Sequence, residues 1–492
     1  MWGETAAGAV RVWQGSGMYY VAAVFAAVLV AFANRYGYHR DELYFLAAGR
    51  RLDWGYADQP PLVPAVARMM ASVDADSLVL LRLPAVAAAT VVVLCAGWMA
   101  RELGGGRGAQ ALAAGVVASS ALVVAAGHLF GTTVFDLAVW SLIVVVMLRL
   151  LRDEPDHRWW LAVGALVGVG LLNKALLIVS VGALVIALLL AGRRKVFATK
   201  YLSWAVGVAV LIWLPYLWWQ AMNGWPQWQL SRAIAEGGSG TSNSRPMFVV
   251  LQLVLMGALV VPVWVLGLWR LWQARRYRAF AVAYVLLFVV FVAVGGKAYY
   301  LGGMYPLLLA AGCVPVVAWL SRHRKAWAAV IPALAVHTAV SVLLFLPVLP
   351  VTALPGSPVL AVNYDAGETV GWPQFVRQVA DARARHSPSA ALLTANYGEA
   401  GAIERFGPAY DLPTPHSGHN AYWWWGAPPG ATEVLTVGIA PRRVAAICAD
   451  IRPAGRIDNG LGLDNDEQHA PMYVCAPRAP WATLWPALKV LG

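Results

Sequence analysis

Long apolar runs, separated by short clusters of basic residues, fill the chain up to about residue 350. A helix that crosses the hydrocarbon core of a bilayer needs about 20 mainly apolar residues, and most of these runs approach that length. Hydrophobic residues make up 60% of the 492 residues and charged residues only 13%. Soluble domains are about half apolar and about a quarter charged. The pattern therefore predicts a polytopic α-helical membrane protein.

Eleven transmembrane helices are predicted. The run 159–191 is too long for one ordinary span, and Asn173-Lys174 interrupts it with a charge that is costly at mid-membrane depth. We therefore assign it two short spans with a hinge at that pair. The other nine predicted spans are 18–34, 79–99, 108–127, 134–150, 203–221, 247–268, 279–294, 299–319 and 327–350.

The basic clusters decide the number and orientation of the spans. With two spans in 159–191, five clusters fall on one side of the membrane, whereas with one span the last three change sides. Short cytoplasmic loops are enriched in Lys and Arg, so the N-terminus is predicted to be cytoplasmic. The same placement explains the net charge of +12 without a nucleic-acid partner. The clusters are Arg101/Arg107, Arg149/Arg152/Arg158, Arg193/Arg194/Lys195/Lys200, Arg270/Arg275/Arg276/Arg278 and Arg322/Arg324/Lys325.

This topology places the first outer loop (residues 35–78), the loop 222–246 and the whole C-terminal part outside the cytoplasm. The first seventeen residues hold one Arg and one Glu and lack the features of a cleaved secretory signal. The first span is therefore expected to be an uncleaved anchor. We expect residues 1–350 to form the transmembrane domain.

From Val351 onward the composition is typical of a soluble α/β domain, which we expect to be extracytoplasmic and to span residues 351–492. Strands are predicted at 390–395 and 433–438. A helix that follows the turn at Asn396 is predicted to run through Arg405, and a second helix to run from Pro441 to Ile451.

The four cysteines fall into two groups. Cys95 and Cys313 lie within apolar runs and are expected to pack in the core. Cys448 and Cys475 both lie in the C-terminal part. Two cysteines in one small domain of an oxidising compartment favour a disulfide.

Acidic residues concentrate in the first outer loop, where Asp41, Glu42, Asp53 and Asp58 lie close together in the sequence. Carboxylates beside a bilayer are costly to desolvate, which makes such a cluster a candidate functional site. Asp41-Glu42 is a candidate general base for a hydroxyl nucleophile. The alternative is structural: Asp41 would cap an interfacial helix that presents Leu43, Leu46 and Leu52 to lipid.

Asp58-Gln59 precedes two prolines, and helix initiation is the favoured explanation of this pattern taken alone. The functional alternative makes Asp58 a ligand for a divalent cation or for the substrate. The sequence contains no Walker, dinucleotide-binding, HExxH or CxxC pattern, so no nucleotide cofactor is expected.

A second candidate site lies between two spans on the outer side. Lys297, with Tyr299 and Tyr300, can hold a lipid phosphate through one point charge and hydroxyl donors. Arg245 is a second candidate partner for an anion. The alternatives are snorkelling side chains and interfacial anchors. Two roles are also open for a group of tryptophans, which can form an interfacial belt or stack on sugars. They are Trp218, Trp219, Trp225 and Trp228.

Together these features resemble the GT-C membrane glycosyltransferases. The greatest resemblance is to the family 39-like bacterial enzymes related to protein O-mannosyltransferases and to the aminoarabinose transferase of lipid A. It covers nearly the whole chain and depends on the order of several short motifs. These are Asp41-Glu42, DQPPL at 58–62, Asn173-Lys174, WWQxxNGWP at 218–226, KAYYLxxxYP at 297–306 and SGHNxYW at 417–423.

The resemblance implies a polyprenyl-phosphate sugar as donor, used without a nucleotide on the outer face of a bacterial cytoplasmic membrane. By resemblance, Asp41 would be the general base of an inverting transfer, and Glu42 would orient it or bind the acceptor. Lys297, Tyr300 and Arg245 would stabilise the departing lipid phosphate. The acceptor would be a hydroxyl on a lipid, a glycan or a protein.

Two positions depart from the family pattern. Gln59 stands where the aminoarabinose transferase has a phosphate-binding Lys, and no His precedes Arg245 where that enzyme has a metal ligand. A divalent cation at Asp58 is therefore weakly supported.

Two other classes of function compete with the enzyme. A transporter, flippase or binding protein for lipid-linked saccharides would place polar groups near the midplane and show repeat symmetry, and the sequence shows no internal repeat. A sugar-sensing scaffold without catalysis would not need Asp41-Glu42. A glycosyltransferase is therefore the favoured prediction.

Overall fold

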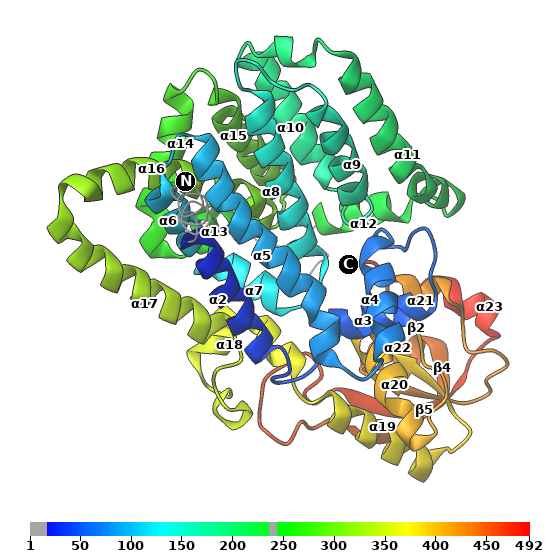
Figure 1. Cartoon of the computed structure of the whole chain (residues 1–492). Helices are drawn as coiled ribbons and strands as arrows, with labels where there is room; N and C mark the ends of the chain where they lie inside the picture. Colours follow the sequence, from blue (N-terminus) through cyan, green and yellow to red (C-terminus); the bar gives the residue numbers. More distant parts are fainter. Residues whose placement is uncertain (1–16, 236–243) are drawn as a thin grey trace, which may run out of the picture. The chain divides into compact units, whose positions relative to one another are not determined.

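The structure is a computed structural model that describes residues 17–235 and 244–492 (Figure 1). Residues 1–16, and part of the predicted outer loop 222–246, lie outside the described residues. The chain divides into two compact units. The helical unit comprises Met1–Ala33, Arg82–Trp218 and Thr241–Val342, and the mixed unit comprises Asn34–Leu81, Trp219–Gly240 and Leu343–Gly492.

These units are defined by contacts, whereas the boundary expected at residue 350 is defined by membrane insertion. The first outer loop was assigned to the transmembrane domain, yet it lies in the same compact unit as the C-terminal segment. The division into domains 1–350 and 351–492 stays a prediction.

Most helices of the helical unit follow the predicted spans, because long apolar runs favour helix. The predicted spans 108–127 and 247–268 are exceptions, since each is divided into two helices. The helices are α2 (Gly17–Phe32), α5 (Leu78–Glu102), α6 (Arg107–Ala118), α7 (Ala121–His128), α8 (Thr132–Leu150), α9 (Trp159–Leu171), α10 (Leu177–Leu190), α11 (Lys200–Met222), α13 (Arg245–Val254), α14 (Val261–Gln273), α15 (Arg278–Val294), α16 (Tyr305–Arg322) and α17 (Trp327–Phe345). Four 3₁₀ turns join them: η1 (Arg194–Phe197), η2 (Ala258–Val260), η3 (Ala298–Met304) and η4 (Arg324–Ala326).

Within the described residues, five helices are long and apolar enough to cross a membrane, or seven if each of two bent pairs forms one span. The bent pairs are α6–α7, at 62°, and α13–α14, at 77°. Helices α2, α9, α10 and α15 are apolar but shorter. The gap between α9 and α10 falls at Asn173-Lys174, as predicted, and the count of eleven spans stays a prediction.

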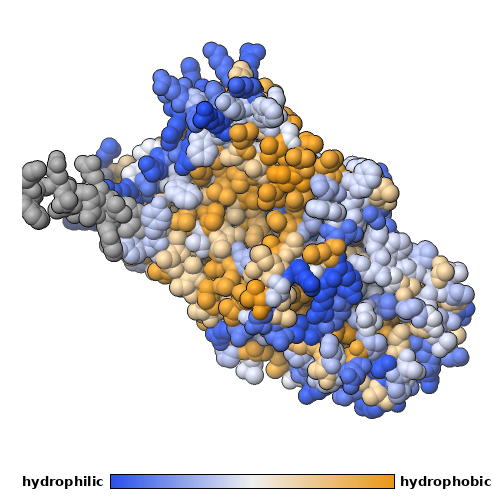
Figure 2. Space-filling view, turned by 45° about the vertical axis from the view of Figure 1, so that its right-hand side comes forward, coloured by the Kyte–Doolittle hydropathy of each residue, from blue (hydrophilic) through white to orange (hydrophobic). Residues whose placement is uncertain are grey.

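Hydrophobic side chains cover a broad face of the molecule (Figure 2). Helices α11 and α17 contribute little buried surface, and only 11% of the apolar window of each is buried. Their exposed residues include Leu211, Leu214, Ile331 and Val336. Surfaces of this kind are stable when hydrocarbon rather than water surrounds them.

Basic clusters of the helical unit meet at one end of it. The Arg152 guanidinium lies 2.5 Å from the Glu102 carboxylate, which joins the clusters after α5 and after α8. Arg276, before α15, donates a hydrogen bond of 2.7 Å to the Leu151 carbonyl. Three of the five clusters are therefore neighbours in space, as the shared side predicted for them requires.

The mixed unit contains a five-stranded sheet in the order β2-β1-β3-β5-β4. Strand β1 is parallel to β2 and β3, and β5 is antiparallel to β3 and β4. The strands are β1 (Ala391–Thr394), β2 (His416–Ser417), β3 (Val434–Val437), β4 (Cys448–Arg456) and β5 (Pro471–Pro477). Strands β1 and β3 lie within the ranges predicted from the sequence.

Within the described residues of the mixed unit, nine short helices accompany the sheet. They are α3 (Arg40–Arg50), α4 (Leu62–Val73), α12 (Pro226–Ala235), α18 (Pro358–Val362), α19 (Trp372–His386), α20 (Tyr397–Phe406), α21 (Ala421–Trp424), α22 (Pro441–Ile447) and α23 (Trp481–Leu484). The 3₁₀ turns are η5 (Val351–Ala353), η6 (Tyr364–Thr369), η7 (Gly407–Tyr410) and η8 (Trp485–Leu488).

The central strands of the sheet are buried on both faces, whereas most residues of the edge strand β4 are exposed. Leu392, Leu435 and Val474 align across β1, β3 and β5, and all three are fully buried. Leu393 and Val434 belong to a second core cluster, which includes Trp481 and Trp485. Burial on both faces explains why β1 and β3 are mainly apolar and do not alternate strictly between apolar and polar residues.

The helix predicted to run from Pro441 to Ile451 is shorter than expected. It ends at Ile447, where Cys448 adopts an extended backbone and begins β4. Cys448 pairs with Pro477 of β5, so the ladder of hydrogen bonds replaces the last helical turn.

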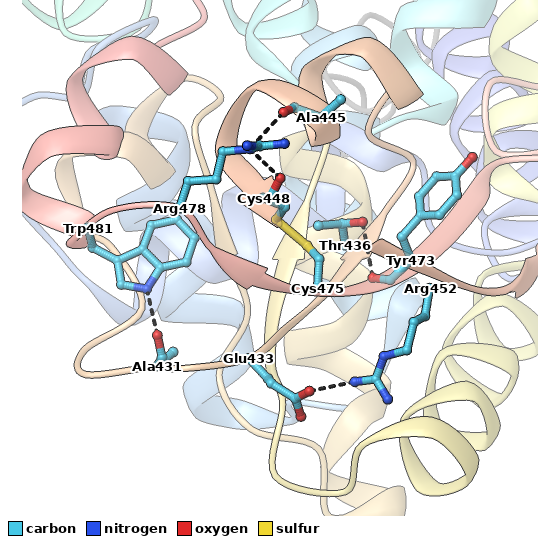
Figure 3. Close-up of a disulfide and its surroundings, with 10 residues drawn as sticks. All are labelled: Ala431, Glu433, Thr436, Ala445, Cys448, Arg452, Tyr473, Cys475, Arg478 and Trp481. Carbon is cyan, nitrogen blue, oxygen red and sulfur yellow. Dashed lines mark hydrogen bonds and ion pairs between the residues drawn. A yellow bond between two sulfur atoms is a disulfide. The ribbon is translucent and has the colours of Figure 1, made fainter. Parts of the chain in front are cut away.

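A disulfide joins Cys448 of β4 to Cys475 of β5 (Figure 3). Beside it, Arg478 donates hydrogen bonds to the carbonyls of Ala445 and Cys448, at 3.1 and 2.6 Å. These carbonyls lie at the C-terminal end of α22, where helices leave acceptors unsatisfied. The disulfide and Arg478 therefore fix the turn from α22 into β4.

Removal of the disulfide should destabilise the mixed unit. The bridge closes a loop of 27 residues, for which the loss of chain entropy in the unfolded state predicts about 2–4 kcal/mol of stabilisation. We expect the double variant Cys448→Ala/Cys475→Ala to melt at a lower temperature than the wild-type chain. A reducing agent should lower the wild-type melting temperature toward that of the variant and leave the variant unchanged. Equal melting temperatures for variant and wild type would contradict this account.

Candidate active site

Helix α3 begins with a capping box that fixes the acidic pair of the first outer loop. The His39 N–H donates to Glu42 Oε2 at 2.8 Å, and the Asp41 N–H donates to His39 Nδ1 at 3.2 Å. The N-cap is therefore His39 and not Asp41. The structural alternative is therefore wrong about the cap. Of the three leucines expected to face lipid, Leu43 is buried and Leu52 is exposed.

Glu42 is fully buried, and its carboxylate serves the helix cap. This position does not support the predicted role in binding the acceptor. The Asp41 side chain, in contrast, is 44% exposed. Its Oδ1 accepts a hydrogen bond of 2.7 Å from the Tyr397 hydroxyl, so the carboxylate is both anchored and open to solvent. Of the acidic pair, Asp41 has the geometry of a base.

Tyr397 reaches Asp41 because α20 packs closely on α3. Gly398 and Gly401 lie on the face of α20 that meets α3. A Cβ at Gly398 would lie 2.8 Å from the Arg40 Cβ, and one at Gly401 would lie 2.9 Å from the Leu43 carbonyl carbon. Both distances are shorter than real Cβ contacts, so only glycine permits this approach.

Asp58 is held by two side chains in the same unit. The Tyr44 hydroxyl donates to its Oδ1 at 2.6 Å, and the Asn420 amide donates to its Oδ2 at 3.3 Å. Burial raises the pKa of Asp58 to about 7, although the hydrogen bond from Tyr44 acts in the opposite direction; the nearby charge of Asp41 raises it further. Asp58 therefore exchanges a proton near neutral pH.

Aromatic rings join the two carboxylates. The ring centroids of Tyr44 and Tyr397 are 4.8 Å apart, and those of Tyr397 and His419 are 4.9 Å apart. Burial lowers the pKa of His419 to about 4, so this ring is neutral near pH 7. We call Asp41, Asp58, Tyr44, Tyr397 and Asn420 the carboxylate cluster.

Two other residues of the first outer loop, Gln59 and Asp53, lie close to Asp58 in the sequence. Gln59 is only 3% exposed, and both polar atoms of its amide lack a hydrogen-bond partner. A buried amide without partners is costly, which makes Gln59 a candidate contact for a bound polar group. Asp53 accepts a hydrogen bond of 2.7 Å from the Trp219 indole, which gives this tryptophan a role beyond an interfacial belt.

A second polar group lies in the helical unit. The Lys174 ammonium lies 5.0 Å from the ring centre of Tyr299 and 5.1 Å from that of Tyr300, a cation–π arrangement. Asp136 of α8 interacts electrostatically with Lys174. We call these four residues the Lys174 cluster. The predicted phosphate ligands Tyr299 and Tyr300 thus share the Lys174 cation, which was predicted from the sequence as part of a hinge and of a resemblance motif but not as a site residue.

The other two predicted phosphate ligands also belong to the helical unit. Lys297 is the N-cap of η3 and is partly buried. Arg245 begins α13, is exposed, and donates a hydrogen bond of 3.4 Å to the Ala293 carbonyl.

The sequence contained a signal for two residues that the predicted site left out. Asp136 and Lys174 are charges within apolar runs, and such charges are rare unless they are paired or functional. No comparable signal pointed to Tyr44 or Tyr397, because tyrosine is common at membrane boundaries and in soluble cores.

A metal site at Asp58 does not fit the residues present. In residues 17–235 and 244–492, no three His, Cys, Asp or Glu side chains gather where they could hold a metal ion. Both oxygens of Asp58 accept hydrogen bonds from side chains. We therefore assign no step to a metal.

Comparison with known proteins supports the resemblance seen in the sequence. A sequence profile of the family described as Dolichyl-phosphate-mannose-protein mannosyltransferase matches residues 58–219, about a third of the chain. No curated protein matches the chain by sequence. Among solved structures, ArnT from Cupriavidus metallidurans in the apo state has a TM-score of 0.60 and 16% identity, over 96% of this chain and 98% of ArnT.

The chain has a GT-C fold. The same ArnT bound to undecaprenyl phosphate matches with a TM-score of 0.59 and 16% identity, over the same shares of the two chains. The predicted GT-C resemblance is confirmed, and the chain is a multi-pass helical membrane protein. Its orientation and the membrane in which it lies stay predictions.

The raised pKa of Asp58 gives a pH dependence of stability. The folded-state pKa of about 7 lies above the unfolded value of about 3.9, so the folded chain binds more protons between them. This stabilisation is complete below pH ~4 and is lost as the pH rises through 7. Asp58→Asn should flatten the dependence between pH 5 and 7 by up to about 1.4 kcal/mol per pH unit, measured by melting at each pH.

Tyr422→Phe is the control for this measurement. It removes a buried hydroxyl that donates to Glu404 and not to Asp58. The variant should keep the wild-type slope, and an equal flattening in both variants would remove Asp58 from the explanation.

The stability lost when Lys174 is neutralised should be recovered when its partner Asp136 is neutralised as well. Lys174→Gln alone leaves Asp136 without its cation, which should destabilise the chain by about 3 kcal/mol. The double variant Asp136→Asn/Lys174→Gln should recover most of the loss, as measured by melting in detergent. Lys200→Gln, at an exposed lysine that begins α11, is the control and should have little effect. A double variant less stable than Lys174→Gln would argue against the pair.

Proposed function

We propose that this chain is an inverting glycosyltransferase that moves a sugar from a polyprenyl phosphate to an acceptor hydroxyl. The GT-C fold and the binding of undecaprenyl phosphate by the structurally similar ArnT support a lipid-linked donor. The observation that carries the proposal is the half-exposed Asp41 carboxylate, anchored by the Tyr397 hydroxyl. The proposed location is the outer face of a bacterial cytoplasmic membrane.

In the proposed reaction, Asp41 takes the proton of the acceptor hydroxyl while that oxygen attacks the anomeric carbon. The new carbon–oxygen bond forms on the face opposite the phosphate. The bond between the anomeric carbon and the phosphate oxygen breaks, and its electron pair leaves with the lipid phosphate. The configuration at the anomeric carbon is therefore inverted.

Charge develops on the leaving phosphate, and the helical unit supplies groups that can stabilise it. Lys297 and Arg245 are cations, and Tyr300 and Tyr299 are hydroxyl donors. Stabilisation of developing charge by fixed donors is often the largest single contribution to catalysis. In this proposal Lys174 holds the two tyrosine rings in place through its cation–π contacts.

Two further residues of the first outer loop, Gln59 and Asp58, would contact the substrate. The unpartnered amide of Gln59 has a donor and an acceptor, which suits the hydroxyls of a sugar. Gln59 is neutral, so it would not replace the phosphate-binding Lys of the resembling enzymes. Each oxygen of Asp58 accepts one side-chain hydrogen bond. The ionised carboxylate keeps further acceptor sites, which would accept from a hydroxyl of the substrate.

The direct test of activity uses purified full-length protein and a panel of radiolabelled polyprenyl-phosphate sugars, with and without EDTA. Release of lipid phosphate from one donor would support the transferase and name the sugar. Loss of release in EDTA would restore a cation at Asp58. Donors that bind or cross a vesicle membrane intact would favour the carrier.

Asp41→Asn tests the base. Asn is nearly isosteric with Asp but cannot accept the proton at neutral pH, so turnover should fall by a factor of about 100 or more. Binding of the labelled donor, measured by filter retention, should change little, because Asp41 is assigned to the acceptor side. Asp53→Asn, in the same loop and hydrogen-bonded to Trp219, is the matched control. Turnover in Asp41→Asn equal to wild type would exclude Asp41 as the base.

A further inference from the structure

We infer that the C-terminal segment supplies two positioning residues of the active site, Tyr397 for Asp41 and Asn420 for Asp58. The inference rests on the proposed function and deepens it. The soluble segment would then be part of the catalytic machinery and not a separate binding module. Both contacts lie within the mixed unit and join residues more than 350 positions apart in the sequence.

The Tyr397 ring is held on three sides, so its hydroxyl has little freedom to leave Asp41. The rings of Tyr44 and His419 lie 4.8 and 4.9 Å away, and the Arg40 guanidinium lies 5.2 Å from the ring centre. The Tyr397 side chain loses its rotamer entropy when the chain folds, so none has to be lost when the acceptor binds. A hydroxyl that is already aligned keeps the Asp41 carboxylate in one orientation for the incoming acceptor.

The backbone on both sides of the contact is also fixed. Tyr397 is the first residue of α20, whose N-cap Asn396 forms a capping box with Glu399. Asp41 lies in the first turn of α3. The glycine-mediated packing of α20 on α3 therefore sets the distance between the two side chains before any substrate binds.

Asn420 lies in a strained backbone conformation, with φ 50° and ψ −135°. Such strain persists only when the surroundings impose it, and it concentrates at functional sites. Here the segment 490–492 imposes it: the Asn420 N–H donates to the Val490 carbonyl at 3.0 Å, and the Gly492 N–H donates to Asn420 Oδ1 at 3.3 Å. The second bond orients the amide so that its Nδ2 faces Asp58.

The orientation of this amide matters for charge. With Oδ1 occupied by Gly492, the Asn420 side chain presents a donor to Asp58. The Tyr44 hydroxyl donates to the other oxygen of Asp58 and accepts from the Ala421 N–H at 3.2 Å. Residues 420 and 421 thus act on Asp58 from two directions, one directly and one through Tyr44.

The test of Tyr397 is Tyr397→Phe, which keeps the ring and removes only the hydroxyl. A hydrogen bond to a charged group predicts a loss in kcat of about 10- to 100-fold, with the KM for the labelled donor within about twofold. Because the hydroxyl stabilises the carboxylate form, the acidic limb of the pH–rate profile should move to higher pH. Tyr422→Phe is the matched control: it removes another buried hydroxyl of the same aromatic group, bonded to Glu404, and should keep the wild-type profile.

A second measurement does not depend on turnover. Melting temperatures of wild type, Asp41→Ala, Tyr397→Phe and the double variant form a double-mutant cycle. The inference predicts coupling: the double variant should melt about 2 °C or more above the value that additive effects would give. The same cycle with Asp58→Ala and Asn420→Ala tests the second contact.

The outcomes separate the inference from the proposed function. Additive melting effects would overturn the inference whatever the activity, and so would wild-type kcat and pH profile in Tyr397→Phe. Coupled melting with reduced kcat supports it. If the wild-type chain releases lipid phosphate from no donor, the proposed function fails, while coupled melting still supports the positioning contacts.

Discussion

The close approach of α20 to α3 is the constraint on which the carboxylate cluster depends. Two glycines remove the side chains that would otherwise separate the helices, and small residues spaced three apart lie on one helix face. The resulting contact brings a tyrosine from the C-terminal segment to the first outer loop. Without that approach Asp41 would be a solvated surface carboxylate, with nothing to orient it toward a nucleophile.

The helical unit contains charged side chains and helix breaks in apolar surroundings, where both are costly unless they are paired. Unsatisfied backbone groups are costly in hydrocarbon, so breaks occur only where protein covers them. The Leu122 N–H at the start of α7 donates to the Leu255 carbonyl at the end of α13, at 3.1 Å, so two breaks satisfy each other. Lys174, at a third break, is accommodated by Asp136 and two aromatic rings.

The parts of the structure that sequence could predict are those encoded locally. Apolar length placed the helices, the charge at Asn173-Lys174 marked a break, and apolar runs located β1 and β3. The sequence also singled out Asp41 in the first outer loop. The helix after Pro441 was overextended because pairing of β4 with β5, a tertiary interaction, ends it. The partners of Asp41 and Asp58 could not be predicted from the sequence. They lie 356 and 362 residues away along the chain, and no local pattern encodes such contacts.

The mixed unit is discontinuous, since three separate stretches of chain form it. During synthesis the ribosome completes Asp41 and α3 long before it makes α20, and nearly all the helical unit is made in between. The first outer loop is therefore without its partner helix until residues 397–406 have been made. Contacts between such distant residues form slowly because a long loop has to close first. A chain that ends before α20 would lack the Tyr397 hydroxyl, so its Asp41 carboxylate would lack this hydrogen bond.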